Sequence, residues 1–209
     1  MKKQLFAVAL ACGFAVGMPG HALAGFAEGA GAYNARQYDL ALREIAPLAR
    51  AGNADAQHLL GLMYYMGRGV KRDYKTALEW HRKAALQGKA DAQYVVGAMY
   101  YTGNTVPQDQ QLAVQWFRRA AEQGHAEAQY ALGLMVRYHV AGMPHDLVIA
   151  TMLWNLASAG GNNNATAQRT AVARLMSQEQ IDEAQALSRN WKPGTPLPMS
   201  SRSGSAPGN

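Results

Sequence analysis

A pattern that recurs every 36 residues is the feature that most constrains how this chain can fold. Gly61, Gly97 and Gly133 are separated by this interval. The same spacing relates three further sets of positions: Ala56, Ala92 and Ala128; Gln57, Gln93 and Gln129; and Met63, Met99 and Met135. Repetition at a period of about 20–50 residues is typical of repeat proteins, whose units bury their apolar faces only against neighbouring units. The sequence therefore predicts an array of similar units.

Each unit is predicted to form two α-helices joined by a loop. Ala92, Val96 and Met99 are spaced i, i+4 and i+7, which places them on one face of a helix. A break that contains glycine follows, and Asp109 can then cap a second helix because its carboxylate accepts from free N–H groups of the first turn. Gly124 marks the end of that helix, since glycine readily adopts the left-handed conformation of a C-cap. One unit is thus an antiparallel helix pair.

The first helix of each unit is predicted to contain a glycine near its middle. Glycine at position 97 lowers the stability of the helix by about 1 kcal/mol relative to alanine. Because the same cost recurs at Gly61 and Gly133, we expect a close approach of the partner helix at this position.

The repeated residues form a longer pattern, A-x-A-Q-x-x-x-G-x-M-Y-x-x-G-x-x-V…D-x-x-x-A-x-x-W-x-x-x-A-A-x-Q-G, which covers about Ala32 to Gly161. This pattern resembles the Sel-1-like repeat, a relative of the tetratricopeptide repeat. The period favours it over the tetratricopeptide repeat, whose length is about 34 residues. The resemblance implies an all-α fold, an α/α superhelical solenoid of antiparallel, tetratricopeptide-like helix pairs. It also implies a scaffold that binds other proteins and has no catalysis of its own.

The chain outside the complete units differs in character. Terminal units of solenoids are atypical because one side faces water, and a segment rich in Pro, Gly and Ser favours disorder. The predicted organisation is an N-terminal capping half-repeat (25–53), three Sel-1-like repeats (54–89, 90–125 and 126–161), a C-terminal pair of capping helices (162–191) and a disordered tail (192–209).

The first 24 residues have the three parts of a secretory signal peptide. Met1-Lys2-Lys3 is basic, Leu5 to Val16 is mostly apolar, and Ala22-Leu23-Ala24 matches an A-x-A cleavage site. We expect cleavage after Ala24 and a bacterial protein that is periplasmic or secreted. Cys12 is the only cysteine in the sequence, so the mature chain would contain no disulfide. No later segment is apolar enough to be a transmembrane helix.

Motifs for catalysis and metal binding are absent from the sequence. It contains no S-x-x-K pair, no G-x-S-x-G elbow and no H-E-x-x-H pair. Its histidines lack the i, i+4 pairing or the cysteine partners of a zinc site. We therefore predict no enzyme, no cofactor and no bound metal. His139 and His145 could approach each other across the loop of the third unit, although an ordinary polar loop is the favoured interpretation.

The positive charge of the chain is a weaker signal. The formal net charge is +6, or +4 without Lys2 and Lys3. A basic cluster at one loop and the following helix start consists of Arg68, Lys71, Arg72 and Lys75. In an exported protein such a cluster would suit acidic lipid head groups or an acidic envelope polymer better than nucleic acid. A solvated helix face is the favoured interpretation, so we expect no nucleic acid and at most weak contact with acidic envelope components.

The candidate binding residues form a second stripe on the first helix of each unit. His58, Leu62 and Tyr65 are spaced i, i+4 and i+7 and lie nearly opposite the core face. Tyrosine and arginine are favoured at binding hot spots because they combine contact area with a polar end. The nine candidates for partner binding are His58, Leu62, Tyr65, Tyr94, Ala98, Tyr101, Tyr130, Leu134 and Arg137. The alternative, that these residues pack between neighbouring units, stays open.

The sequence therefore predicts an exported interaction module that holds an unidentified protein or peptide on the concave face of the solenoid. A second hypothesis is a hydrolase that acts on β-lactams or cell-wall peptides, since some exported, cysteine-rich members of the repeat family have been linked to penicillin binding. This chain departs from them because its units contain no cysteine pairs. A third hypothesis is a binder of acidic envelope polymers.

Overall fold

A computed structural model describes residues 19–201 of the chain, and the side chains of residues 25–201. This part contains helices and no strand: α1 (Pro19–Asn34), α2 (Tyr38–Arg50), α3 (Ala54–Met66), α4 (Tyr74–Leu86), α5 (Ala90–Thr102), α6 (Gln110–Ala121), α7 (Ala126–Arg137), the short 3₁₀ helix η1 (Val140–Gly142), α8 (Leu147–Ala159), α9 (Asn163–Ala173) and α10 (Gln178–Asn190). Residues 1–18 of the predicted signal peptide and residues 202–209 of the predicted tail lie outside the described residues.

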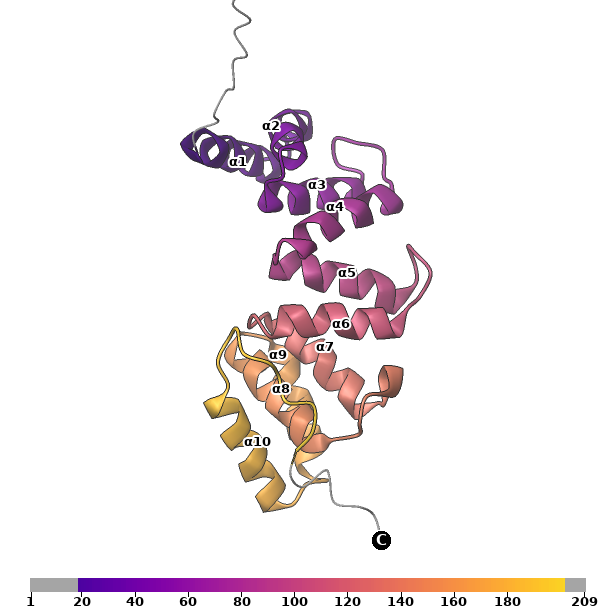
Figure 1. Cartoon of the computed structure of the whole chain (residues 1–209), viewed down its shortest axis with the longest axis vertical. Coiled ribbons are helices and arrows are strands. Elements are labelled where there is room, and N and C mark those ends of the chain that lie inside the picture. The colour runs from indigo at the N-terminus through magenta and orange to yellow at the C-terminus, as the bar shows by residue number, and fades with distance from the viewer. Residues whose placement is uncertain (1–18, 202–209) are drawn as a thin grey trace, which may run out of the picture.

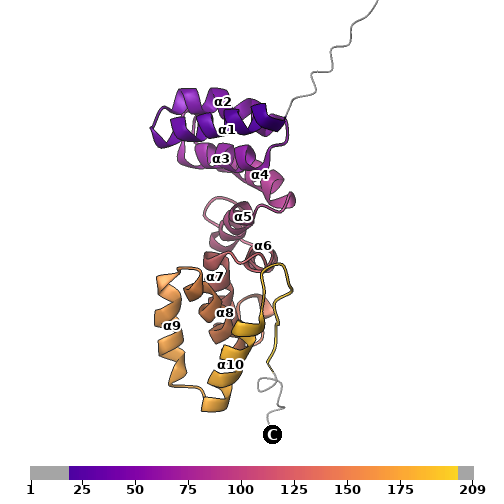
Figure 2. The ribbon, with the colours of Figure 1, turned by 90° about the vertical axis from the view of Figure 1, so that its left-hand side faces the viewer.

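The helices stack along the long axis of an elongated molecule (Figure 1, Figure 2). α1 packs against α2, α3 against α4, α5 against α6, and α7 against α8. The second helix of each of the first three pairs also packs against the first helix of the next pair. The predicted α/α solenoid of helix pairs is therefore confirmed.

The predicted helix starts and ends are present. Asp109 accepts a 2.8 Å hydrogen bond from a backbone N–H in the first turn of α6. Asp73 and Asp146 cap α4 and α8 in the same way. Gly88 and Gly124, which follow α4 and α6, have positive φ angles of 92° and 91°. These local signals set the length of each helix, so successive units keep the same size.

The close approach predicted at the mid-helix glycines is made by a ring from the partner helix. A Cβ atom added to Gly97 would lie 2.8 Å from Cδ1 of Phe117, and one added to Gly61 would lie 2.9 Å from the ring of His81. A tryptophan, Trp154, covers the equivalent glycine of the third repeat. Because Cβ atoms are essentially never found closer than 3.0 Å to such neighbours, glycine is the residue that lets the two helices pack at this distance.

A buried glutamine on the first helix of each repeat joins it to the preceding unit. Nε2 of Gln93 donates to the carbonyl oxygen of Ala85 at 3.0 Å, and Nε2 of Gln123 donates to Oε1 of Gln93 at 2.7 Å. Gln57 and Gln129 bond the ends of α2 and α6 in the same way as Gln93 bonds α4. Each of these carbonyls also accepts the backbone N–H of the glycine that follows the helix, as Ala85 does from Gly88 at 3.0 Å. The glutamine is thus a second donor to that carbonyl, and the bond pairs its own buried amide while linking two units.

The N-terminal unit is larger than the predicted half-repeat. α1 and α2 pack together as a complete helix pair, in which Ala32 of α1 and Ile45 of α2 belong to one buried cluster. α1 begins at Pro19 and continues through the predicted cleavage site after Ala24. Its many glycine and alanine residues form no clear apolar stripe, so the helical periodicity did not reveal it.

The two C-terminal helices do not form the predicted pair. α9 and α10 both pack against α8, and they pack little against each other. Figure 2 shows them joined at one end and diverging from there. Ala165 and Val172 are the buried residues of α9. This narrow apolar stripe packs against α8, so α9 has no second apolar face for a contact with α10. A capping box begins α10, in which Ser177 and Gln180 exchange hydrogen bonds of 3.2 and 2.9 Å.

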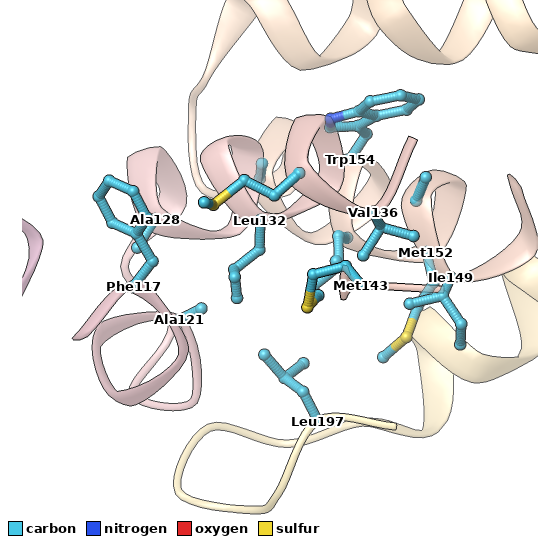
Figure 3. Packing of buried hydrophobic residues seen from close by; sticks show 14 of the residues in the cluster. Phe117, Ala121, Ala128, Leu132, Val136, Met143, Ile149, Met152, Trp154 and Leu197 are labelled. Atoms are coloured by element: carbon cyan, nitrogen blue, oxygen red, sulfur yellow. The ribbon is translucent and has the colours of Figure 1, made fainter. Parts of the chain in front are cut away.

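The segment that follows α10 packs back onto the helices, so the prediction of a disordered tail is wrong for residues 192–201. We call this segment the C-terminal strap. The side chain of Leu197 is 2% exposed and belongs to the largest buried cluster. Figure 3 shows it pointing from the strap toward Leu132 and Met143. A single leucine in a segment rich in proline, glycine and serine is enough to anchor it.

Two carboxylates hold the backbone of the strap. The N–H of Leu197 donates to Oε1 of Glu122 at 3.2 Å, and the N–H of Ser201 donates to Oδ2 of Asp146 at 2.7 Å. Gly194 adds a bond of 2.6 Å from its N–H to the backbone carbonyl of Glu122. The strap therefore ties α6 to the start of α8.

Replacing Gly97 with alanine tests the ring contact. Gly97→Ala forces a methyl group against Phe117 and should lower the free energy of unfolding by about 1–3 kcal/mol. Gly31 is the matched control, because it lies in α1 with no atom within 4 Å of an added Cβ. Gly31→Ala should be neutral or stabilising by up to about 1 kcal/mol. Urea unfolding followed by circular dichroism measures both, and equal effects at the two sites would contradict the role of the contact.

Candidate functional site

A cleft of about 270 Å³ lies between α3 and α5, the first helices of two successive repeats. Most of its wall is apolar. The lining residues are Leu62, Tyr65, Met66, Tyr94, Val95, Ala98, Met99, Thr102 and Thr105. Four of the nine predicted binding residues are among them: Leu62, Tyr65, Tyr94 and Ala98.

Helical spacing explains why these residues meet. Leu62 and Met66 are i and i+4 on α3, and Tyr94, Ala98 and Thr102 follow one another at i+4 steps on α5. Ala98 occupies the register position that leucine occupies in the repeats before and after it. Its methyl group leaves space that a leucine side chain would fill, so the cleft depends on this one small residue.

Thr105 lines the cleft, and its Oγ1 is buried with no hydrogen-bond partner. A buried hydroxyl without a partner is unfavourable. Because this oxygen is buried, it offers no exposed surface to a ligand in the cleft.

Tyr94 connects the cleft to the next repeat. The centroid of its ring lies 4.9 Å from that of His125 in a stacked arrangement, and 5.6 Å from that of Phe117. Burial raises the pKa of the Tyr94 phenol above its usual value, and the carboxylate of Glu127 adds to the rise. Tyr94 is therefore neutral near pH 7, and the wall that it forms carries no charge.

A row of alternating charges links the N-terminal ends of α3, α5 and α7. Nζ of Lys89 lies 2.7 Å from Oδ1 of Asp55 and 3.0 Å from Oδ2 of Asp91. His125 continues the row, with nitrogen–oxygen distances of 3.6 Å to Asp91 and 3.4 Å to Glu127. Burial lowers the pKa of Lys89, but hydrogen bonds to Asp55 and Asp91 outweigh it and raise the pKa. Such partly exposed pairs stabilise little individually, so the row chiefly aligns the three helix ends.

His58, another predicted binding residue, packs inside the first repeat. Its ring centroid lies 4.9 Å from that of His81, which is fully buried. Both ring nitrogens of His81 and Nδ1 of His58 are buried without a hydrogen-bond partner. Burial lowers the pKa of His81 from 6.5 to about 3, and His58 adds to the decrease. The pKa of His58 is lowered as well, first by its own burial. The pair is neutral at pH 7.

The candidates of the third repeat contact the helices around them. Nη1 of Arg137 donates to Oε1 of Gln168 on α9 at 3.0 Å, and the carbonyl oxygen of Tyr130 accepts from the indole N–H of Trp154 at 3.3 Å. Leu134 is half-buried against the same core. Only the Arg137 bond reaches the following unit, because Trp154 belongs to the same repeat as Tyr130 and bonds its backbone.

Tyr101 lies outside the lining of the cleft. It is 40% exposed, and its ring centroid is 6.4 Å from that of Phe117. Five lining residues were not among the predicted candidates: Met66, Val95, Met99, Thr102 and Thr105. Met66 and Thr102 continue the predicted stripe by one more helical turn, whereas Thr105 lies in a loop and has no periodic signal.

The basic cluster is divided between internal contacts and solvent. Nη1 of Arg68 donates to the hydroxyl of Tyr33 at 2.7 Å, and its guanidinium lies over the rings of Tyr33 and Tyr38. Arg72 lies over the ring of Tyr74, with 5.5 Å between the guanidinium carbon and the ring centroid. Arg68 therefore joins the loop after α3 to the preceding unit.

His139 and His145 approach each other as considered from the sequence, with stacked rings whose centroids are 4.8 Å apart. Within the described part of the chain, no group of three or more His, Cys, Asp or Glu side chains could hold a metal ion. Among residues 19–201, no helix is both long and apolar enough to cross a membrane.

Stacked helix pairs in a fixed register define a helical-repeat solenoid. The family model for the Sel1 repeat matches residues 54–89, 90–125 and 126–162. The chain belongs to the Sel1 repeat family, as the sequence pattern indicated. Sel1 repeats are generally scaffolds for interactions between proteins and typically have no catalytic activity.

Two solved structures are similar to this chain. A Sel1 repeat protein from Oxalobacter formigenes is 31% identical with a TM-score of 0.67, and the match covers 70% of this chain and 60% of that one. The protein c5321, a protective antigen present in uropathogenic Escherichia coli strains and displaying an SLR fold, is 32% identical with a TM-score of 0.70. That match covers 81% of this chain and 37% of c5321. This chain thus spans less than two thirds of either neighbour. Curated proteins include no match.

The buried histidine pair predicts a pH-dependent stability. Above pH 6.5, His81 is neutral in the folded and the unfolded chain and contributes no pH dependence. Between pH 6.5 and about 3, the unfolded chain binds a proton that the folded chain excludes, so the free energy of unfolding falls by up to about 1.4 kcal/mol per pH unit.

The double variant His58→Tyr, His81→Phe copies the second repeat and should remove this slope. Urea unfolding at pH 7.5 and pH 5 should show a loss about 2 kcal/mol smaller in the variant than in the wild type. His139→Gln, in an exposed loop, is the control and should keep the wild-type slope. Identical slopes in the wild type and the double variant would contradict the prediction.

Proposed function

We propose that this protein is a non-catalytic scaffold that binds a segment of another protein on the concave face of the solenoid. Its anchor point is the cleft between α3 and α5. Membership of the Sel1 repeat family supports protein binding as the role. The observation that carries the choice of site is the cleft itself, where Tyr65 and Tyr94 from two repeats border about 270 Å³ of mainly apolar space.

The chemistry of the cleft favours a particular kind of partner segment. Its apolar wall suits a large aliphatic or aromatic side chain, because burial of apolar surface drives such contacts. The partner is therefore expected to insert one apolar anchor residue between the two repeats.

Filling the cleft tests the proposal. A photoreactive benzoylphenylalanine at Met66, a lining residue that is exposed at the rim of the cleft, should give a discrete adduct with the partner in the intact source cell. Adding Ala98→Trp should reduce the adduct at least about tenfold, which corresponds to about 1.4 kcal/mol of binding free energy. Circular dichroism should show an unchanged fold, because the new ring occupies existing space.

The same photoreactive residue at Gln115 is the matched control, since Gln115 is exposed on the second helix of the repeat. The adduct should be absent from this position. An adduct that forms equally from Met66 and Gln115, or that survives Ala98→Trp, would place the interaction elsewhere.

We further propose that the protein is exported, as a periplasmic or secreted chain that begins at Gly25. Support comes from the order of basic, apolar and A-x-A segments at the N-terminus. Mass spectrometry of the protein from fractionated source cells should find the N-terminus at Gly25 in the envelope or the medium. A cytosolic chain that retains Leu5–Val16 would disprove export.

A further inference from the structure

The C-terminal helices α9 and α10 form the walls of a groove whose floor is α8. The groove has a volume of about 600 Å³, within the range of about 300–1,000 Å³ that is usual for ligand sites. Thr151 and Asn155, one helical turn apart on α8, lie at its floor. The groove is separate from the cleft between α3 and α5, and a ligand there would not depend on the function proposed above.

The groove changes character along its length. At the end where a turn joins α9 to α10 (Figure 2), the lining is apolar and includes Ala173, Met176 and Ile181. Farther from the turn it is basic, with Arg169 on α9 and Arg189 on α10. Ile181 and Arg189 are eight residues apart on one helix, so these two ends are about 12 Å apart at 1.5 Å per residue.

A hydrogen-bond chain holds the basic end in place. Nη1 of Arg169 donates to Oδ1 of Asn155 at 3.1 Å, and Nδ2 of Asn155 donates to Oγ of Ser188 at 3.3 Å. This chain runs from α9 through α8 to α10 and orients the guanidinium at the groove wall.

The two arginines lack an acidic partner of their own. Within residues 25–201, neither Arg169 nor Arg189 takes part in a salt bridge, and no acidic residue lines the groove. An oriented guanidinium without a carboxylate is complementary to a carboxylate ligand, because its planar fork of N–H groups matches the two oxygens.

We propose that this groove binds the C-terminal end of a polypeptide whose last residues are apolar. The terminal carboxylate binds Arg169 and Arg189, and an apolar side chain fills the closed end at Met176 and Ile181. Three to four extended residues, at about 3.3 Å each, span the distance between these ends. The exposed amide of Gln185 lies between them and can bond the peptide backbone. A fatty acid has no backbone groups to bond this amide, so octanoate distinguishes the two kinds of ligand.

A short peptide and its amide test the proposal directly. The probe is acetyl-Leu-Ala-Leu with a free carboxylate, titrated into the full chain labelled with ¹³C at its methionine methyl groups. The Met176 resonance should shift with a Kd on the order of 1 mM or below, and the same peptide with a C-terminal amide should bind at least tenfold more weakly. Met66 and Met99 line the other cleft, so their resonances report separately on the function proposed there.

Substitutions locate the carboxylate. Arg169→Gln and Arg189→Gln should each weaken binding of the acid peptide about tenfold with unchanged circular dichroism. Arg174→Gln is the control, because Arg174 is exposed at the end of α9 and does not line the groove. The proposal is overturned if acid and amide bind equally, if octanoate shifts Met176 as effectively as the peptide, or if Met176 does not respond at about 5 mM peptide.

Discussion

A hydrogen bond from a buried glutamine to the end of the preceding helix turns a row of helix pairs into one structure. The last carbonyl groups of every helix lack partners inside it, and a stack buries them at each boundary. The N–H of Gly88 bonds one such group, the carbonyl of Ala85, and Gln93 adds a second bond to it from the next unit. Its equivalents recur in register. At the boundary between α8 and α9, Thr166 stands in the glutamine's place and bonds Ser158 at 2.8 Å instead. α9 still packs on α8, but the regular pairing ends after it, because α10 packs against α8 rather than against α9.

The features with functional potential are departures from this uniform frame. Ala98 replaces the leucine of the neighbouring repeats, and the missing atoms open the cleft between α3 and α5. His58 and His81 replace the tyrosine and phenylalanine of the second repeat, which introduces the pH-sensitive pair. The divergence of α9 and α10 from their expected pairing creates the groove above α8. The repeats therefore share one arrangement of helices but differ in a few side chains.

The stacked helix pairs could be predicted because they depend on sequence features that recur. The period, the caps and the mid-helix glycines indicated helix pairs and the close approach at Gly97. The cleft could be predicted only in part, since Leu62 and Ala98 belong to a periodic stripe whereas Thr105 lies in a loop. Contacts that occur only once in the chain leave no periodic signal in the sequence. The anchoring of Leu197 depends on helices distant in sequence, and α1 carries too many small residues to show an amphipathic period.

The strap also divides the molecule mechanically. In a solenoid each unit contacts only its neighbours, so small changes at every boundary add up to bending and twisting of the whole stack. The strap bonds α6 at Glu122 and the start of α8 at Asp146, and this brace resists such changes in the C-terminal half. The cleft between α3 and α5 lies outside the braced part, so only contacts between neighbouring units set its width. The groove between α9 and α10 has α8 as its floor, which is one of the two helices that the strap joins.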